Sequence, residues 1–351
     1  MSPGVLDRAD GFERVVYATD AAAGLRSIVA IHSTRLGPAL GGCRIRAYAS
    51  EDEALTDVLR LDEAMTWKAA AAGLDLGGGK AVVIADPQRD KTEALLRAFG
   101  RVIDSLGGRF ITSVDVGSSV ADLDVMSRET RWVVGVSPFN GGSGDPSPAT
   151  ARGVLGAIRA CLQHRWRDVS LDGRKVAVQG AGKVGFHLCV SLAQQGAEVV
   201  VADPNADALG ALAAEVNVRT VDPDAIVGVD CDIFAPCALG GVLDAETIPH
   251  ISAPIVCGSA NNQLASTQDA KRIADAGILY APDFIVNAGG LISVVDELDG
   301  WNADRVFARV DAIGRTLLDV LHLAAETGST PHDAAVEFAK RRIRTLDALN
   351  P

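Results

Sequence analysis

The sequence feature that most constrains the fold is a glycine motif placed between two predicted strands. Residues 175–179 form a short apolar strand, and the pattern G-x-G-x-x-G follows it directly. A helix is predicted over residues 186–195 and a second strand over 197–202, which ends at Asp203. The motif consists of Gly180, Ala181, Gly182, Lys183, Val184 and Gly185. This order of strand, glycine motif, helix, strand and acid predicts a Rossmann-type, doubly wound domain with a dinucleotide site.

The glycines and the acid of this motif each have a physical role in such a site. Gly180 would allow a tight turn, Gly182 would let a pyrophosphate approach the backbone, and Gly185 would let the helix pack on the strand. The phosphates would meet the helix N-terminus, where unpaired N–H groups and the helix dipole favour anions. Asp203 would accept hydrogen bonds from the adenosine ribose and repel a 2′-phosphate, which favours NAD over NADP. The alternative for Asp203 is a turn residue.

A second unusual stretch, residues 65–83, contains Lys68 and Lys80 with Asp75 as the only other charge. Apolar surroundings disfavour the charged form of an amine, so a lysine here can act as a base near neutral pH. Glycines 77–79 leave no side chain between the backbone and a small ligand. The alternative is a glycine turn with a lysine extending towards solvent at each end.

Composition narrows the classes of function. The net charge of −12 argues against nucleic acid or an anionic membrane surface as the main partner. No apolar run is long enough to span a bilayer, and the N-terminus has no apolar signal core, so we expect a cytoplasmic protein. The six cysteines are scattered, which predicts free buried thiols. The histidines form no cluster, so we expect no metal.

The length of 351 residues suggests two domains, and residues 137–146, rich in glycine, proline and serine, separate them. Residues 1–136 would form an α/β catalytic and oligomerisation domain, and residues 147–329 the NAD-binding domain. Ser147 is predicted to cap the helix that opens the second domain, with Pro148 at its first position. The predicted elements of the first domain are strands over 12–18, 25–31, 81–86 and 109–114 and helices over 51–65 and 92–106.

Polar residues follow several predicted strands. Asp115 comes directly after the strand at 109–114. Later strands are predicted over 231–236, 254–260 and 278–282, and ligands of open parallel sheets bind beyond the carboxyl ends of such strands. Asn261 and Asn262 are predicted there, and the further candidates for the cofactor site are Cys237, Ala238 and Asn287. For Asp115 and the asparagines, the alternative is a role in a polar turn or helix cap.

Two lysines and one aspartate suit a substrate that carries a carboxylate and an amine. One lysine can pair with the carboxylate, and the other, kept partly neutral, can deprotonate the ammonium or activate water. The aspartate can move protons as an imine is hydrolysed. A hydroxy-acid dehydrogenase would instead need a histidine or a serine–lysine arrangement, which the sequence lacks. A non-catalytic NAD-binding sensor would be expected to lose the lysine pair or Asp115.

Seven segments, in one order along the chain, give a more specific indication. They are LGPALGG at 36–42, MTWK at 65–68, LGGGK at 76–80, DVG at 115–117, APCA at 235–238, SANN at 259–262 and YAPD at 280–283. In these segments the chain resembles the Glu/Leu/Phe/Val amino-acid dehydrogenases over nearly its whole length. It is most similar to the valine and leucine dehydrogenase branch, with phenylalanine dehydrogenases next.

The resemblance implies reversible, NAD-dependent oxidative deamination of an L-amino acid to a 2-oxo acid and ammonia. Lys68 would bind the substrate carboxylate, Lys80 would be the general base, and Asp115 would assist proton transfer. Further residues implied at the site are Gly41 and Gly42, which would line it, and Ser147 and Thr150, near the nicotinamide. The resemblance also implies two α/β domains separated by a cleft, C-terminal helices at about 330–351 packed on the first domain, and a homo-oligomer from dimer to octamer.

The same resemblance places the substrate side chain among Leu40, Ser113, Leu291 and Val294. No cation stands at these positions, which disfavours glutamate and favours valine, leucine or isoleucine. Ser113 and Leu291 depart from the leucine branch and would reshape the pocket. Because one methylene changes binding by only about 1–3 kcal/mol, several of these amino acids can be substrates. The alternative is an aromatic amino acid, as in phenylalanine or tryptophan dehydrogenases.

Overall fold

The computed structural model describes residues 5–347 and divides the chain into two compact units. Unit 1 consists of Met1–Asp145, Ser293–Asn302 and Ala339–Pro351, and unit 2 of Pro146–Ile292 and Ala303–Phe338. The chain therefore changes unit after Asp145 and after Asn302, and also within helices α10 (Gly289–Val295) and α13 (Pro331–Asp347). The predicted class, a two-domain α/β protein with a Rossmann-type sheet, is confirmed.

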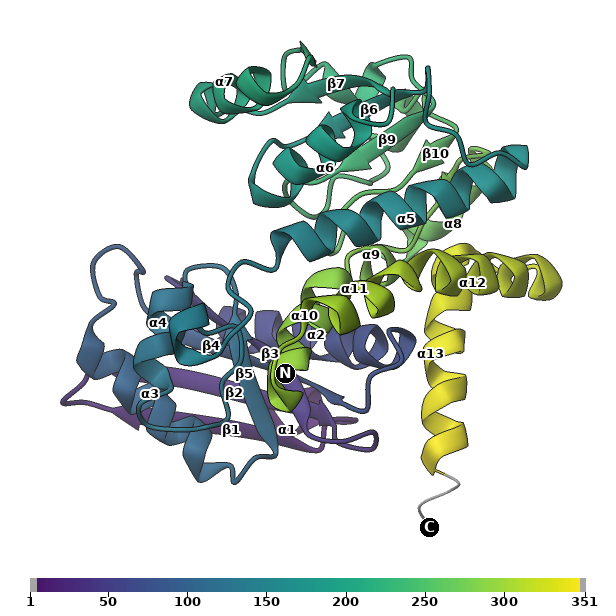
Figure 1. Ribbon diagram of the computed structural model, residues 1–351. Helices are drawn as coiled ribbons and strands as arrows, with labels where there is room; N and C mark the ends of the chain where they lie inside the picture. The colour runs from purple at the N-terminus through teal and green to yellow at the C-terminus, as the bar shows by residue number, and fades with distance from the viewer. Residues whose placement is uncertain (1–4, 348–351) are drawn as a thin grey trace. The chain divides into compact units, whose positions relative to one another are not determined.

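Unit 1 is built on a five-stranded sheet of order β1-β2-β4-β3-β5 (Figure 1). The strands are β1 (Arg14–Asp20), β2 (Leu25–Ser33), β3 (Ala39–Arg46), β4 (Gly77–Ile84) and β5 (Phe110–Val114). The helical segments of this unit that lie wholly within it are α1 (Val5–Arg8), α2 (Glu51–Ala71), α3 (Glu93–Ser105), α4 (Val120–Met126), η1 (Pro138–Asn140) and η4 (Asp296–Asp299). Strand β3 runs parallel to both of its neighbours, β4 and β5, whereas β2 is antiparallel to β1 and β4.

Two apolar cores lie on opposite faces of this sheet. On one face α2 packs on β2 and β4 through a cluster that includes Ile28, Val58 and Val82. On the other face α3 and α4 pack on a larger cluster that includes Phe99 and Phe110. Helix α2 begins where the sequence predicts, because the Ser50 side chain accepts a hydrogen bond from the backbone N–H of Glu53. The sheet is thus covered on both faces, and α2 fixes one face over the middle strands.

Glycines 77–79 lie inside strand β4 and not in a turn, so the turn alternative for this stretch is wrong. A Cβ atom on Gly78 would clash with Thr66 of α2, and one on Gly79 would lie 2.5 Å from the Phe110 ring. The space beside these two glycines is therefore filled by the protein's own helix and core. Because these glycines have no side chains, Thr66 and Phe110 can pack closely on the two faces of β4, and the strand is not opened to a ligand.

Unit 2 contains a six-stranded, wholly parallel sheet of order β11-β10-β9-β6-β7-β8. Its strands are β6 (Lys175–Gln179), β7 (Glu198–Ala202), β8 (Arg219–Thr220), β9 (Ile233–Pro236), β10 (Ile255–Val256) and β11 (Leu279–Tyr280). Its helical segments are α5 (Ser147–Trp166), α6 (Lys183–Ala193), α7 (Ala206–Glu215), η2 (Ile226–Gly228), η3 (Ile248–His250), α8 (Gln268–Asp275), α9 (Asp283–Val286), α11 (Ala303–Asp311) and α12 (Ile313–Thr327). Counted from its first strand, this is the 3-2-1-4-5-6 order of a dinucleotide-binding fold.

Two smaller predictions can be compared with the structure. Ser147 is the first residue of α5 and Pro146 its cap, so the predicted cap is wrong by one position. All six cysteines are free, and all except Cys237 are buried, as the sequence predicts.

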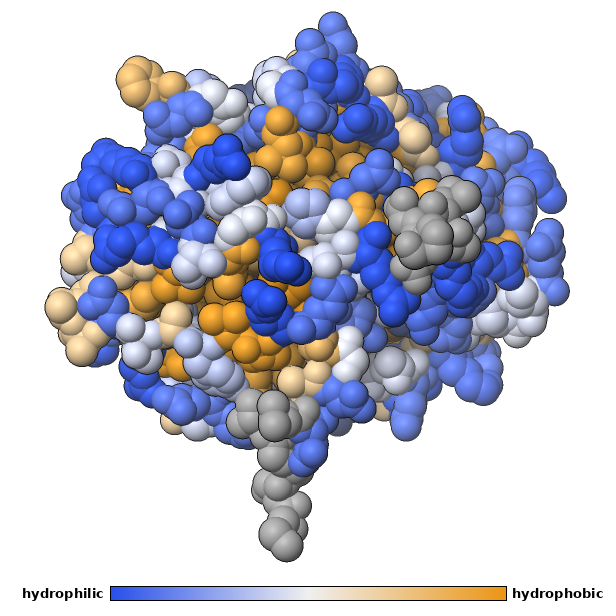
Figure 2. Space-filling model, turned by 90° about the horizontal axis from the view of Figure 1, so that it is seen from below, coloured by the Kyte–Doolittle hydropathy of each residue, from blue (hydrophilic) through white to orange (hydrophobic). Residues whose placement is uncertain are grey.

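Apolar side chains also reach the surface. Figure 2 shows apolar residues exposed between charged ones on the face seen from below. Large exposed apolar residues include Tyr17 on edge strand β1, Phe139 in η1 and Trp301.

None of the helices within residues 5–347 combines the length and the apolar character that are needed to cross a membrane.

The packing of α2 over glycine 78 makes a stability prediction. Gly78→Ala forces a methyl group into Thr66, so we expect a loss of about 1–3 kcal/mol in the free energy of unfolding, measured by urea denaturation. The control is Gly210→Ala in α7, where a Cβ meets no heavy atom within 4 Å. That change should stabilise the protein by up to about 1 kcal/mol. Equal stability of the two variants would contradict this account of the glycine run.

Candidate active site and dinucleotide site

Lys80 and Asp115 form an ion pair that spans a strand. Lys80 lies in β4 and Asp115 directly follows β5, and β3 lies between those strands. The two side chains are only 8% and 16% exposed. Gly42 of β3 makes this contact possible, because a Cβ there would lie 2.7 Å from the Cβ of Asp115. The structure thus brings together three residues that the sequence predicted at the site.

The environment of Asp115 favours its ionised form. Burial raises the pKa of this carboxyl, but the charges of Lys80 and Arg44 and hydrogen bonds outweigh it, so the net pKa lies below the ordinary value. One of these hydrogen bonds comes from the backbone N–H of Val116, at 2.7 Å from Oδ1. Asp115 is therefore a carboxylate at neutral pH, held beside the Lys80 amine.

Three residues that surround this pair were not predicted from the sequence. The Nε atom of Arg44 lies 3.5 Å from Oδ2 of Asp115. The same guanidinium donates to both carboxylate oxygens of Asp57 in α2, at 3.0 and 2.8 Å. The Tyr48 hydroxyl donates to Asp57 at 2.6 Å. The alternation of side chains along a strand could have identified Arg44. It stands two residues after Gly42 and therefore lies on the same face of the sheet.

The other predicted substrate residues lie in different parts of the chain. Gly41 and Gly42 pair with Thr112 and Ser113 of β5, and Leu40 pairs with Gly78 of β4. Lys68 is half-buried in the last turn of α2. Leu40, Ser113 and Val294 are buried in unit 1, and Leu291 is buried in unit 2.

Asp62 is a second unusual acid in unit 1. Its side chain on α2 is fully buried, and neither carboxylate oxygen has a partner at normal hydrogen-bond geometry among the described residues. Burial raises its pKa well above the ordinary value, although the His32 backbone and the Lys80 charge oppose this. The protonated form of Asp62 is therefore favoured in the folded protein.

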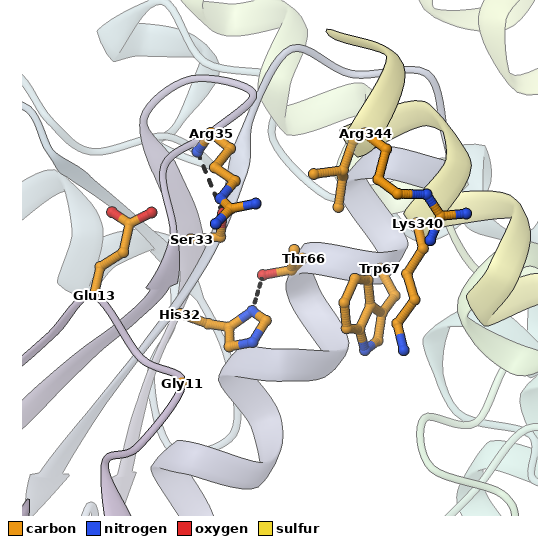
Figure 3. A pocket seen from close by; sticks show the side chains of 10 residues that line it. Gly11, Glu13, His32, Ser33, Arg35, Thr66, Trp67, Lys340 and Arg344 are labelled. Carbon is orange, nitrogen blue, oxygen red and sulfur yellow. Dashed lines mark hydrogen bonds between the residues drawn. The ribbon is translucent and has the colours of Figure 1, made fainter. Parts of the chain in front are cut away.

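A cavity of about 320 Å³ in unit 1 lies against the same helix (Figure 3). His32, Thr66, Trp67 and Lys340 are among its lining residues, and Lys80 and Asp115 are not. The Nδ1 atom of His32 lies 2.8 Å from the Thr66 hydroxyl, and burial lowers the pKa of the imidazole. This contact links β2 to the turn of α2 that precedes Lys68, so its structural effect is to fix the end of that helix.

The glycine motif of unit 2 has the geometry expected of a phosphate loop. Gly180 has φ +104°, which favours glycine, and a Cβ on Gly185 would clash with the Gly180 carbonyl. A Cβ on Gly182, by contrast, would meet no heavy atom within 4 Å, and Gly182 is exposed. Helix α6 begins at Lys183 and has no side-chain cap at Gly182, and a helix N-terminus of this kind favours the binding of an anion.

Asp203 and the loop after β9 border this motif. Asp203 directly follows β7 and accepts hydrogen bonds from the backbone N–H groups of Ala181, at 2.7 Å, and Asn205, at 2.8 Å. A Cβ on Gly180 would lie about 3.0 Å from Ala238 and 3.1 Å from Cys237, so these two predicted residues adjoin the glycine turn. This is the point between β6 and β9 where the strand order reverses, which is the usual ligand position in such sheets.

A second group of predicted cofactor residues gathers in unit 2. Asn287 is buried and donates from Nδ2 to Oδ1 of Asn261 at 2.9 Å, and its own Oδ1 has no hydrogen-bond partner among the described residues. Asn262 has φ +52° and donates its backbone N–H to Asp283. Thr150 packs against the start of α10 at Gly290, and Ser147 lies one turn earlier in α5. The open side of Gly182 and the unpaired amide oxygen of Asn287 fit a dinucleotide with a carboxamide-bearing ring.

Two family models match the chain. "Glu/Leu/Phe/Val dehydrogenase, dimerisation domain" matches residues 13–135, and "Glutamate/Leucine/Phenylalanine/Valine dehydrogenase" matches residues 141–214 and 204–348. The chain belongs to the Glu/Leu/Phe/Val dehydrogenase family. The predictions that it is a family member, an enzyme and an amino-acid dehydrogenase are therefore confirmed.

Three relatives of this dehydrogenase are informative. Leucine dehydrogenase of Geobacillus stearothermophilus is 48% identical over 95% of this chain and 91% of its own length. Valine dehydrogenase of Streptomyces virginiae is 51% identical over 95% of this chain and 94% of its own length. The crystal structure of L-tryptophan dehydrogenase from Nostoc punctiforme superposes with a TM-score of 0.83, at 44% identity, over 97% of this chain and 98% of that one.

The buried Asp62 carboxyl predicts how stability depends on pH. Its folded-state pKa is raised, so its favourable contribution is present below the unfolded pKa and is lost as pH rises through the folded value. The substitution Asp62→Asn should therefore stabilise the dehydrogenase at pH 8 but not at pH 3.5. We expect this gain in the free energy of unfolding to appear in urea denaturation at pH 8, with about 1.4 kcal/mol for each unit by which the pKa is raised. Parallel pH curves for the two proteins would refute the assignment.

Proposed function

We propose that this dehydrogenase catalyses the reversible, NAD-dependent oxidative deamination of a branched-chain L-amino acid to its 2-oxo acid and ammonia. The observation that carries the proposal is the buried ion pair between Lys80 and Asp115. Its support from related proteins is the similarity to enzymes named leucine and valine dehydrogenase over 95% of the chain.

The chain's own residues have complementary roles in this reaction. Lys68 pairs with the substrate carboxylate and so orients the α carbon. NAD, when bound, would supply the acceptor for the hydride of that carbon. Lys80 takes a proton from the substrate ammonium and passes it to Asp115, so that it can next accept a proton from the water that attacks the resulting imine. Asp115, a carboxylate beside the Lys80 amine, receives and returns protons as ammonia leaves.

The choice of NAD rests on the acid that follows β7. Asp203 stands beside the glycine turn, where it accepts the Ala181 N–H. A second negative charge from a 2′-phosphate near this carboxylate would be repelled. The phosphates of NAD would approach the backbone at Gly182, and Asn261, Asn287 and Thr150 would hold the nicotinamide end.

The residues expected to contact the substrate side chain are Leu40, Ser113, Leu291 and Val294. They are mostly apolar and include no cation, which suits valine, leucine or isoleucine. An aromatic amino acid is a second candidate, because a 44% identical relative of closely similar structure is named L-tryptophan dehydrogenase. The two candidates share every catalytic step and differ only in the size of the side chain that is accepted.

We also propose that the dehydrogenase is a homo-oligomer. Its first matching family model is described as a dimerisation domain, and unit 1 has an edge strand, β1, that exposes Tyr17. Edge strands and exposed apolar groups are common features of subunit interfaces. The buried free thiols suit a reducing, cytoplasmic location.

The substrate proposal predicts the result of a rate measurement. NADH formation at alkaline pH, measured with a panel of L-amino acids, should be fastest with valine, leucine or isoleucine. Because the expected side-chain contacts are mostly apolar and include no cation, glutamate should be at least tenfold slower. Fastest turnover of tryptophan or phenylalanine would favour the second candidate, and no turnover of any amino acid would contradict the proposed reaction.

The role of Asp203 predicts a change in cofactor preference. In Asp203→Ser the repulsion of a 2′-phosphate is removed, so the ratio of kcat/KM for NAD to that for NADP should fall about tenfold or more. The matched control is Asp207→Ser, which removes an exposed acid four residues later in the first turn of α7 and should keep the wild-type ratio. An unchanged ratio in Asp203→Ser would contradict the assignment.

A further inference from the structure

The ion pair between Lys80 and Asp115 has a second cation beside it. The Arg44 guanidinium lies between two carboxylates, with Nε at 3.5 Å from Asp115 and Nη1 at 2.8 Å from Asp57. Arg44 and Asp57 are only 18% and 21% exposed, and the Tyr48 hydroxyl holds Asp57 at 2.6 Å. The position of Arg44 is therefore fixed by its backbone in strand β3 and by the pairing of its guanidinium with Asp57 of helix α2.

When Lys80 is protonated, the positive charges of Lys80 and Arg44 balance the negative charges of Asp115 and Asp57. This cluster of four residues has one negative charge in excess when Lys80 is deprotonated and acts as a base. Once Lys80 gives up its proton, Asp115 is a largely buried carboxylate that needs another cation nearby. Arg44 remains charged at any pH at which an enzyme works. We propose that Arg44, anchored by Asp57, is a positioning residue that serves as the permanent counter-ion of Asp115 and so allows Lys80 to release its proton. This inference rests on the proposed role of Lys80 as the base.

Other charged or titratable groups of unit 1 act on the cluster from the elements around it. They are Cys43 of β3, Asp62 of α2, and the Lys91–Asp122 ion pair beside α4. Cys43 is buried and its thiol pKa is raised, Asp62 favours its protonated form, and Lys91 and Asp122 neutralise each other at 2.7 Å. Arg44 is therefore the fixed positive charge nearest to Asp115, apart from Lys80, among these groups of the described residues.

The sign of the expected effect follows from electrostatics. A fixed positive charge favours the neutral form of a nearby amine, so removing Arg44 makes Lys80 harder to deprotonate. The acid limb of kcat/KM for deamination should then move to higher pH. Arg44 and Lys80 both lie beside the Asp115 carboxylate, and with partial solvent screening we expect the acid limb to shift by roughly one pH unit.

The experiment compares Arg44→Gln with Arg46→Gln between pH 7 and 11, using the fastest amino acid of the panel and NAD. Arg46 is the matched control, because it lies on the same strand but is half exposed, and its guanidinium pairs with Glu53 and lies over the Tyr48 ring rather than beside Asp57 or Asp115. Both variants meet the same substrate, so the titration of its own amine cancels in the comparison. We expect the acid limb of Arg44→Gln to move up by about one unit, with a rate about tenfold lower on that limb and recovery at high pH, while Arg46→Gln matches the wild type.

An unmoved acid limb in Arg44→Gln, or an equal loss of rate at every pH, would overturn the inference. If Arg44→Gln does not fold, Arg44→Lys gives the same test, since a single ammonium is not expected to bridge both carboxylates as the guanidinium does, and the limb should move less but in the same direction. Lys80→Ala separates the two proposals. An active Lys80→Ala enzyme would refute the proposed base and this inference with it, whereas an inactive one with an unmoved Arg44→Gln limb would refute this inference alone.

Discussion

The ion pair between Lys80 and Asp115 depends on a missing side chain in the strand between them. In a sheet of order β4-β3-β5, side chains of the outer two strands meet only if the middle strand leaves room. Gly42 supplies that room, and any larger residue there would meet the Cβ of Asp115. Because burial of either charge alone would be costly, the rest of unit 1 must keep β3, β4 and β5 in register. The parallel pairing of β3 with both neighbours is what holds that register.

The sequence predicted the members of this pair but not its surroundings. Lys80 and Asp115 stand in short motifs, and a motif can be found in a sequence without knowledge of the fold. Arg44 and Asp57 are thirteen residues apart on a strand and a helix, and only the packing of α2 on the sheet brings them together. The position of the β4 glycines inside a strand was not predicted for the same reason. Three glycines locally favour a turn, whereas in the structure they lie in a strand, where Thr66 fills the space beside Gly78 and Phe110 the space beside Gly79.

The dinucleotide site was more predictable, because most of its determinants are local. The turn at Gly180, the start of α6 and the acid at Asp203 all lie within one βαβ unit of about thirty residues. The hydrogen bond from Asn287 to Asn261 joins segments 26 residues apart. Both residues were predicted at the cofactor site, but neither spacing nor periodicity could predict that they touch. The Ser147 cap was wrong by one residue, which is the usual error at helix ends.

Helix α2 shows how one element can supply two acids with opposite properties. Asp57 faces Arg44 and Tyr48 and is held as a charged partner, whereas Asp62, little more than one turn later, is buried without a well-aligned hydrogen-bond partner among the described residues. With Asp62 favouring its protonated form, the charges of Lys80 and Arg44 are balanced by those of Asp115 and Asp57. An amino acid brings one carboxylate and one ammonium, so its entry leaves that balance unchanged. In the proposed mechanism, proton movement between the substrate and Lys80 would then be the event that alters the charge of the cluster, and Arg44 would compensate for it.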